Sequence, residues 1–534
     1  MNSLNRLMLG AVLFAGTLFL GSAHAELTQV SVGGQIRIRM EQWHNTFYPG
    51  PRPAVISPVV RIPASVVTGR PTGDLRLGEN IVSYFKWGHE SADPAFIQQR
   101  SSVYVHADFT DDVAAHIQLE NWSVWGEDTF RSNYFNGVDG DAATTNDNME
   151  LYQAYIEARD LWGTPVRLRI GRQELNFGSG WLVGNNTNFT DFQGLYFDAA
   201  RLTYTPGDFT IDAFWAKVAE NSAPLGEHQD GDFFGVYGSY AGFENITLDA
   251  YWLYLHDSVD VWDTRGNIFA EWIEDLRDID DYGATHLHTL GLRAAGNLNS
   301  FDFELEAAYQ FGDAGRLGQR FQQNNYGDDN ADFSAFGANA EIGYTLDVKT
   351  APRFFLYGAY FGGEDNRDIT LREWLNPYSR PDASISFNRL FSNKVYSYFL
   401  DENSYLSNVW LAGGGVQIAP TEATQVQLKA AHYEALEAFD LPLNFRLFGK
   451  RVFWTGPLTF LTTPSDTDLG WDINLTASYA YSEDLVFRAG YAHYFLGAGL
   501  EDGNFVDLNG LLFNGASNRR DDGSYYFIET ELNF

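Results

Sequence analysis

The feature that most constrains this chain is an alternation of apolar and polar side chains that recurs throughout the sequence. In the clearest case, residues 301–311, aromatic and aliphatic side chains alternate mostly with acidic and amide ones. A period of two is that of a β-strand, so each such segment has one apolar and one polar face. Similar segments lie at residues 36–40, 103–109, 115–119, 166–170, 246–254, 336–346, 426–430 and 471–481. We interpret them as strands that cross a bilayer at a tilt.

Short and long connections alternate between these strands. The short ones are at residues 110–112, 160–164, 205–208, 242–244, 296–299, 347–352, 420–423 and 482–484. The long ones are at about residues 44–97, 125–148, 175–193, 220–229, 257–284, 313–331, 362–407, 436–467 and 496–521. These eight turns and nine loops connect eighteen strands. The sequence therefore predicts an all-β fold, a transmembrane antiparallel β-barrel of about 18 strands with short periplasmic turns and long extracellular loops.

Residues 1–25 have the pattern of a secretory signal peptide. Arg6 gives a positive start, residues 7–20 form a short apolar run, and Ala23 and Ala25 offer small side chains for cleavage. A membrane anchor is the competing interpretation, although the run is shorter than a spanning helix requires. We therefore expect the barrel to occupy residues 26–534 as a single domain.

The first long loop, residues 44–97, holds seven of the 17 prolines of the chain. Proline has no backbone N–H to donate, so this segment is not a central strand. It either folds into the lumen or stands outside the barrel.

Composition excludes several other classes of protein. No later apolar run is long enough for a spanning helix, although 45% of the residues are hydrophobic. The absence of cysteine excludes disulfide frameworks and thiolate sites. The net charge of −35 argues against nucleic-acid binding, which depends on basic side chains. A soluble β-sandwich remains an alternative, but it does not explain the alternation of turns and loops.

Strand parity separates side chains that face lipid from those that face the lumen. The inward basic candidates are Arg37, Arg39, Arg167, Arg169, Arg201, Arg293, Lys429 and Arg488, and the inward acids include Glu304 and Glu306. Pairs such as Arg167 and Arg169 place two guanidinium groups on one face of a strand, where they suit carboxylates or phosphates of a passing solute. Alternatively, these arginines pair with wall acids across neighbouring strands.

The segment Arg167–Gly178 (RLRIGRQELNFG), followed by Trp181, Asn185 and the 197–204 strand, resembles the alginate-export family of outer-membrane barrels. The resemblance covers residues 150–220 by motif and the remainder by strand count. It implies an eighteen-stranded porin with arginines along the path of an anionic uronate polymer. By motif position it nominates Arg167, Arg169, Arg172 and Arg201. The acid-rich wall and the proline-rich first loop depart from that pattern.

We therefore predict a porin of the bacterial outer membrane, in contact with lipid, that passes hydrophilic solutes including anionic saccharides, with no cofactor, no metal centre and no catalytic residues. No hydrolase or phosphate-loop signature is present in the sequence. The alternative is a plugged structural or surface-binding barrel with Ca²⁺ in its acidic extracellular loops. The loop acids that suggest Ca²⁺ are Asp139, Asp141, Asp278, Asp280, Asp281, Asp328, Asp329 and Asp332.

Overall fold

The structure is a computed structural model of the chain. It describes residues 26–44, 95–109, 112–125, 149–185, 194–220, 230–258, 284–313, 331–363, 383–399, 406–437, 440–441, 443–447, 450–454, 463–464, 466–501 and 522–534. Residues 1–25 lie outside these ranges, as does most of the proline-rich loop. His44 and Ala95–Ile97, predicted to belong to that loop, are instead the end of β1 and the start of β2.

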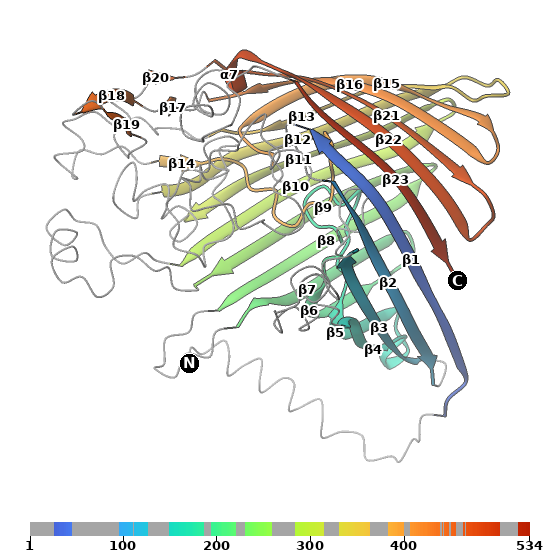
Figure 1. Cartoon of the computed structure of the whole chain (residues 1–534). Helices are drawn as coiled ribbons and strands as arrows, with labels where there is room; N and C mark the ends of the chain where they lie inside the picture. The colour runs from blue at the N-terminus through green and yellow to red at the C-terminus, as the bar shows by residue number, and fades with distance from the viewer. Residues whose placement is uncertain are drawn as a thin grey trace, which may run out of the picture.

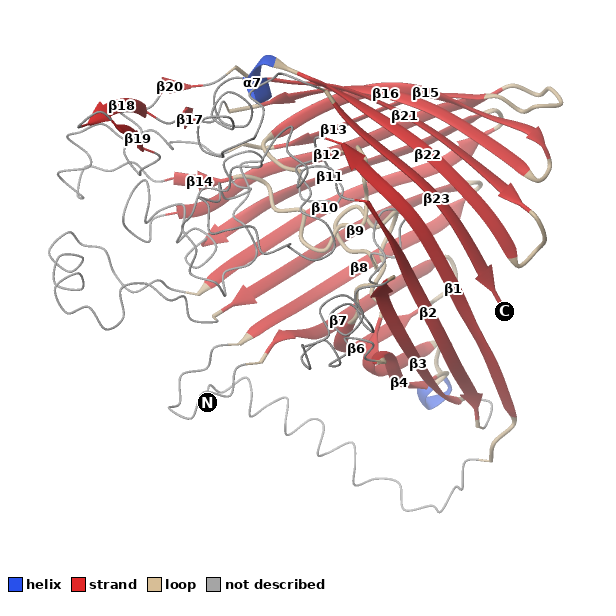
Figure 2. Cartoon of the chain, in the orientation of Figure 1, coloured by secondary structure: helices blue, strands red, loops and turns tan. Residues whose placement is uncertain are grey.

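Eighteen long strands form one closed antiparallel barrel (Figures 1 and 2). They are β1 (Gln29–His44), β2 (Ala95–Asp108), β3 (Val113–Val124), β4 (Glu150–Ala158), β5 (Val166–Gln173), β6 (Phe197–Tyr204), β7 (Phe209–Ala219), β8 (Gly231–Phe243), β9 (Ile246–Asp257), β10 (Thr285–Leu298), β11 (Phe301–Asp313), β12 (Ala331–Thr345), β13 (Arg353–Phe361), β15 (Val409–Thr421), β16 (Thr424–Ala435), β21 (Asp468–Ala480), β22 (Leu485–Leu496) and β23 (Gly523–Asn533). Each strand pairs with the next along this series, and β1 pairs with β23 to close the wall. The predicted strand number and the alternation of turns and loops are confirmed.

The remaining elements are short. They are η4 (Leu161–Gly163), β14 (Ala383–Ile385), β17 (Asp440–Leu441), β18 (Leu443–Leu447), β19 (Lys450–Trp454), β20 (Thr463–Pro464) and α7 (Ala498–Glu501). No described helix is long and apolar enough to cross a membrane. Only β14 joins the barrel sheet, where it pairs in parallel with the start of β12.

The outer face of the wall is apolar, as alternation requires for strands that meet lipid. Large hydrophobic side chains are exposed on strand after strand, and Leu356, Leu292, Ile156 and Ile528 are each more than 60% exposed. Their sequence neighbours Tyr357, Arg293 and Glu157 are half-buried or buried and point to the lumen. The outward face of the barrel is therefore its contact with membrane lipid.

We expect Leu292→Arg to lower the free energy of unfolding by about 2–4 kcal/mol, the cost of a cation on the lipid face near the bilayer midplane. Leu292 is 67% exposed and lies in the middle of β10. Val348→Arg is the matched control, because Val348 is also exposed but lies in the turn between β12 and β13. Urea unfolding of both variants in lipid vesicles measures the difference. Equal losses in the two variants would contradict the assignment of the lipid face.

Two connecting segments fold into the lumen, residues 174–185 after β5 and residues 386–399 after β14. They meet at a parallel bridge between Val183 and Phe391, and the backbone N–H groups of Phe391 and Gly184 donate to the carbonyls of Leu182 and Phe391. Gly180 allows the close approach, since its φ is +74° and a Cβ there would collide with the amide of Asn393. We call residues 174–185 the first lumen segment and residues 386–399 the second.

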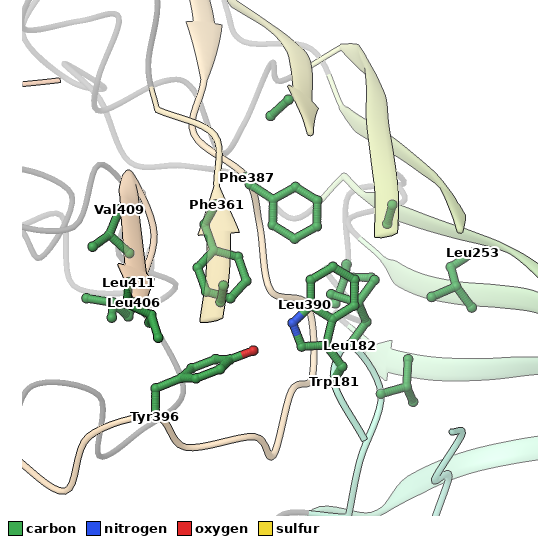
Figure 3. Close-up of a cluster of buried hydrophobic side chains, with 14 of the residues drawn as sticks. Trp181, Leu182, Leu253, Phe361, Phe387, Leu390, Tyr396, Leu406, Val409 and Leu411 are labelled. Atoms are coloured by element: carbon green, nitrogen blue, oxygen red, sulfur yellow. The ribbon is translucent and has the colours of Figure 1, made fainter. Parts of the chain in front are cut away.

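A hydrophobic cluster anchors both segments to the wall (Figure 3). The Trp181 ring of the first segment stacks on Phe387 of the second and on Phe361 of β13, with ring centroids 5.8 and 6.1 Å apart. Leu253 of β9 and Leu411 of β15 join the same cluster from other parts of the wall. Side chains from several sides of the barrel thus converge on the two segments and fill part of its interior.

Candidate functional site: an arginine-lined chamber in the lumen

Beside β1–β6 the lumen contains a chamber of about 840 Å³. Its lining is mostly polar and consists of Gly34, Gln35, Arg37, Arg100, Ser102, Tyr104, His116, Gln118, Gln153, Tyr155, Arg169, Glu174, Asn176, Asn185, Arg201, Arg488, Glu531 and Asn533. Five of these side chains are arginines and two are glutamates. The first lumen segment contributes Glu174, Asn176 and Asn185, so this segment borders the chamber as well as the hydrophobic cluster.

One carboxylate joins three arginines at the seam where β1 meets β23. The carboxylate of Glu529 accepts from Nε of Arg37 and Nε of Arg39 at 2.8 Å each and from Nη1 of Arg488 at 2.8 Å. The side chains of Arg39 and Glu529 are fully buried. Arg488 also donates to Glu531 at 2.7 Å, which leaves its guanidinium at the chamber wall. We call Arg37, Arg39, Arg488 and Glu529 the seam cluster.

Arginines also face each other directly across strand pairs. Arg37 lies opposite Arg100 in the β1–β2 register, and Arg169 lies opposite Arg201 in the β5–β6 register. Like charges in such positions destabilise a sheet. Stability alone therefore does not account for this placement, and the chamber gains a concentration of guanidinium groups from it.

Each of these arginines also bonds to a carboxylate on its other neighbouring strand. That carboxylate lies either directly opposite the arginine or diagonal to it. Arg100 Nη2 bonds to Glu120 Oε2 at 2.5 Å, Arg169 Nη2 to Glu157 Oε2 at 2.6 Å, and Arg201 Nε to Asp212 Oδ1 at 2.8 Å. Glu120, Glu157 and Asp212 are buried in the wall and do not line the chamber. These three acids thus do not face the chamber, whereas the arginines that they pair with do.

The structure brings together only part of the predicted set. Arg37, Arg169, Arg201 and Arg488 line the chamber, and Arg39 is buried behind them. Arg167 does not line the chamber; its Nη2 lies 3.5 Å from the Thr203 hydroxyl, and it has no ion pair within the described part of the chain.

Arg172 does not lie with the other arginines. It is three residues from Arg169, so strand alternation points it to the opposite, outer face of the wall. There its Nε and Nη2 donate to Asp198 at 2.9 and 3.0 Å. The neighbours of Asp198, Phe197 and Ala199, are buried in the lumen cluster, which places Asp198 outside.

Arg293, Glu304 and Glu306 form a separate group on β10 and β11. Arg293 Nη1 bonds to Asp249 at 2.8 Å, its Nε bonds to Glu304 at 3.0 Å, and Glu306 lies 3.9 Å from the same Nε. Tyr251 donates to Glu306 at 2.8 Å. This group faces the lumen but does not line the chamber.

Sequence reasoning missed Arg100. Residues 98–102 are all polar, so the inner and outer faces of this part of β2 cannot be told apart in the sequence. The alternation is recognisable only from Val103 onward. Its pairing with β1, opposite Arg37, is the signal that identifies it, and that register follows only from the folded barrel.

No group of three His, Asp or Glu side chains is arranged to hold a metal ion among the residues that the structure covers. The loop acids predicted to bind Ca²⁺ lie outside those residues, apart from Asp332, which belongs to β12.

Comparison with known proteins identifies one family. Residues 73–511 match the protein family described as alginate export. The sequence matches no curated protein. Among solved structures, Pseudomonas aeruginosa OccK8 (OprE) aligns with a TM-score of 0.48 and 11% identity over 95% of this chain and 98% of its own. For P. aeruginosa OccK9 (OpdG) the values are 0.49, 9%, 95% and 98%, and for OccD1 (OprD) 0.47, 13%, 96% and 97%.

Proposed function

Because the chain belongs to the alginate export family of outer-membrane barrels, we propose that it passes an anionic saccharide of the uronate type through the arginine-lined chamber. Family and fold make the chain a porin-type channel of the bacterial outer membrane. The solute is our inference, as are its passive movement and the absence of a catalytic role.

The observation that carries this proposal is the placement of five arginines on the chamber wall, four of which bond to acids that do not line the chamber. A guanidinium forms paired hydrogen bonds with a carboxylate, and uronate rings carry one carboxylate each. A wall that is acidic overall would repel a polyanion, but a local row of cations at the chamber offsets that repulsion. Arg100, Arg169 and Arg201 each retain further N–H groups beyond these ion pairs, since a guanidinium has five.

We expect the double variant Arg169→Gln, Arg201→Gln to shift ion selectivity from anions toward cations and to weaken block of the current by an oligouronate. Removal of both cations takes one partner from Glu157 and from Asp212 and leaves Glu174 and Glu531 as acids on the chamber wall. The reversal potential in a planar bilayer under a salt gradient measures the selectivity.

Arg172→Gln is the matched control, because Arg172 loses the same charge on the outer face of the wall. We expect it to keep the selectivity of the unmodified protein. A double variant that behaves like this control would show that the chamber arginines do not govern passage.

A second candidate function follows from the two lumen segments. Their hydrophobic cluster fills part of the interior, as the plug of a structural or surface-binding barrel would. Such a barrel conducts no ions, whatever its extracellular loops bind. A refolded protein that inserts into the bilayer without conductance would favour this function over the channel.

A further inference from the structure

A second, smaller cavity of about 220 Å³ opens on the lumen where β15, β16, β21 and β22 lie side by side (Figure 1). Its polar lining consists of Gln417, Gln425, Gln427, Thr476, Ser478 and Arg488. None of the described residues that line it is acidic. Arg488 lines both this cavity and the chamber.

The side chains of this cavity have hydrogen-bonding capacity to spare. Gln427 Nε2 donates to Gln417 Oε1 at 3.2 Å. The side chains of Gln425, Thr476 and Ser478 make no hydrogen bond to any residue that the structure describes. Amides and hydroxyls both donate and accept. A ligand can therefore bond to this row without breaking an ion pair.

An aromatic ring of the second lumen segment completes the cavity. Tyr398 lines it together with Phe527 of β23. Lys429, the next inward residue of β16 after Gln427, lies with its Nζ 5.5 Å from the centre of the Tyr398 ring. Neutral donors and acceptors suit the hydroxyl groups around a sugar ring, and aromatic rings suit its C–H faces.

We propose that this cavity is a hydroxyl-binding subsite for one sugar ring of an acidic oligosaccharide, whose adjacent carboxylate is held by Arg488. The inference rests on the proposed function and narrows it. The preferred solute carries hydroxyl-bearing rings together with carboxylates, and a small inorganic anion uses the chamber alone.

The test compares block of the single-channel current by a uronate tetramer with the permeability of sulfate relative to chloride. In the variant Gln425→Met, Gln427→Met, we expect the blocking concentration of the tetramer to rise about tenfold, the effect of losing one or two neutral hydrogen bonds. The sulfate permeability stays the same, because no charge is removed. Arg488→Gln changes both readouts.

Gln99→Met is the matched control, since Gln99 lies on the outer face of β2, where its Oε1 accepts from the indole of Trp125. One result would overturn the subsite and leave the proposed function standing. In it, tetramer block is unchanged in the Gln425→Met, Gln427→Met protein but weakened in the Arg169→Gln, Arg201→Gln protein. Equal changes in tetramer block and in sulfate permeability in the Gln425→Met, Gln427→Met protein would also overturn the subsite. If the tetramer does not block the unmodified protein, the proposed function fails and the subsite fails with it.

Discussion

Glu529→Gln is expected to lower the free energy of unfolding by about 3–5 kcal/mol, the cost of removing one partner from a buried ion pair. The carboxylate of Glu529 is fully buried and bonds to Arg37, Arg39 and Arg488. Glutamine has nearly the same shape, so the change isolates the charge. Urea unfolding in lipid vesicles, followed by tryptophan fluorescence and by the gel mobility of the unheated protein, measures the loss.

Glu531→Gln is the control for this prediction. Glu531 bonds to Arg488 from a partly exposed position, and its side chain is 16% accessible to solvent. A partly exposed ion pair is screened by solvent more than a buried one, so we expect a much smaller loss. Comparable losses in the two variants would show that the seam cluster is not the principal ionic contribution at this site.

Replacing residues 386–399 by a short glycine–serine linker is expected to raise the single-channel conductance several-fold. This second lumen segment packs on Trp181 and Phe361 inside the barrel, and its removal clears that part of the lumen. The hydrogen bonds between the long strands of the wall remain, because consecutive strands pair with each other. Conductance in a planar bilayer is the measurement.

A point substitution weakens the attachment of the second lumen segment to the wall without removing the segment. Gln310 of β11 is fully buried, and its amide donates to the Asn388 carbonyl and accepts from the Asn388 N–H, both at 2.7 Å. Gln310→Leu removes both bonds, and we expect a current with frequent transitions between levels. Unchanged conductance after the linker replacement would place the narrowest part of the pore elsewhere.

The sequence alone predicted the strands of the barrel wall but not the two segments that fill part of the lumen. A strand that separates lipid from a polar lumen must alternate, so parity identified the strands and placed Arg37, Arg169 and Arg488 on the inner face. The same rule, applied strictly, assigns Arg172 to the outer face, and the family motif suggested otherwise. Strand parity is therefore the better guide to which arginines line a pore.

The two lumen segments follow no period, and for this reason they escaped prediction. Trp181 and Phe387 are buried by contacts with residues about two hundred positions apart in the sequence. The Gly-rich stretch around Gly180 was recognised as a loop, but its approach to Asn393 depends on both segments turning inward. The segments on either side of the 420–423 turn were predicted only as strands, and the cavity at Gln425 arises from the neighbours that the barrel supplies.

Closure of the barrel joins two strands separated by nearly the whole chain, with Arg39 bonded to Glu529 across 490 positions of sequence. We expect this junction to form after the local hairpins, because contacts of such long range carry a larger loop-closure entropy. A slip of one residue between β1 and β23 would turn Glu529 toward lipid and leave Arg37 and Arg39 without its carboxylate. We therefore expect the seam cluster to favour the correct register during assembly, because only that alignment of the two edge strands pairs its arginines with Glu529.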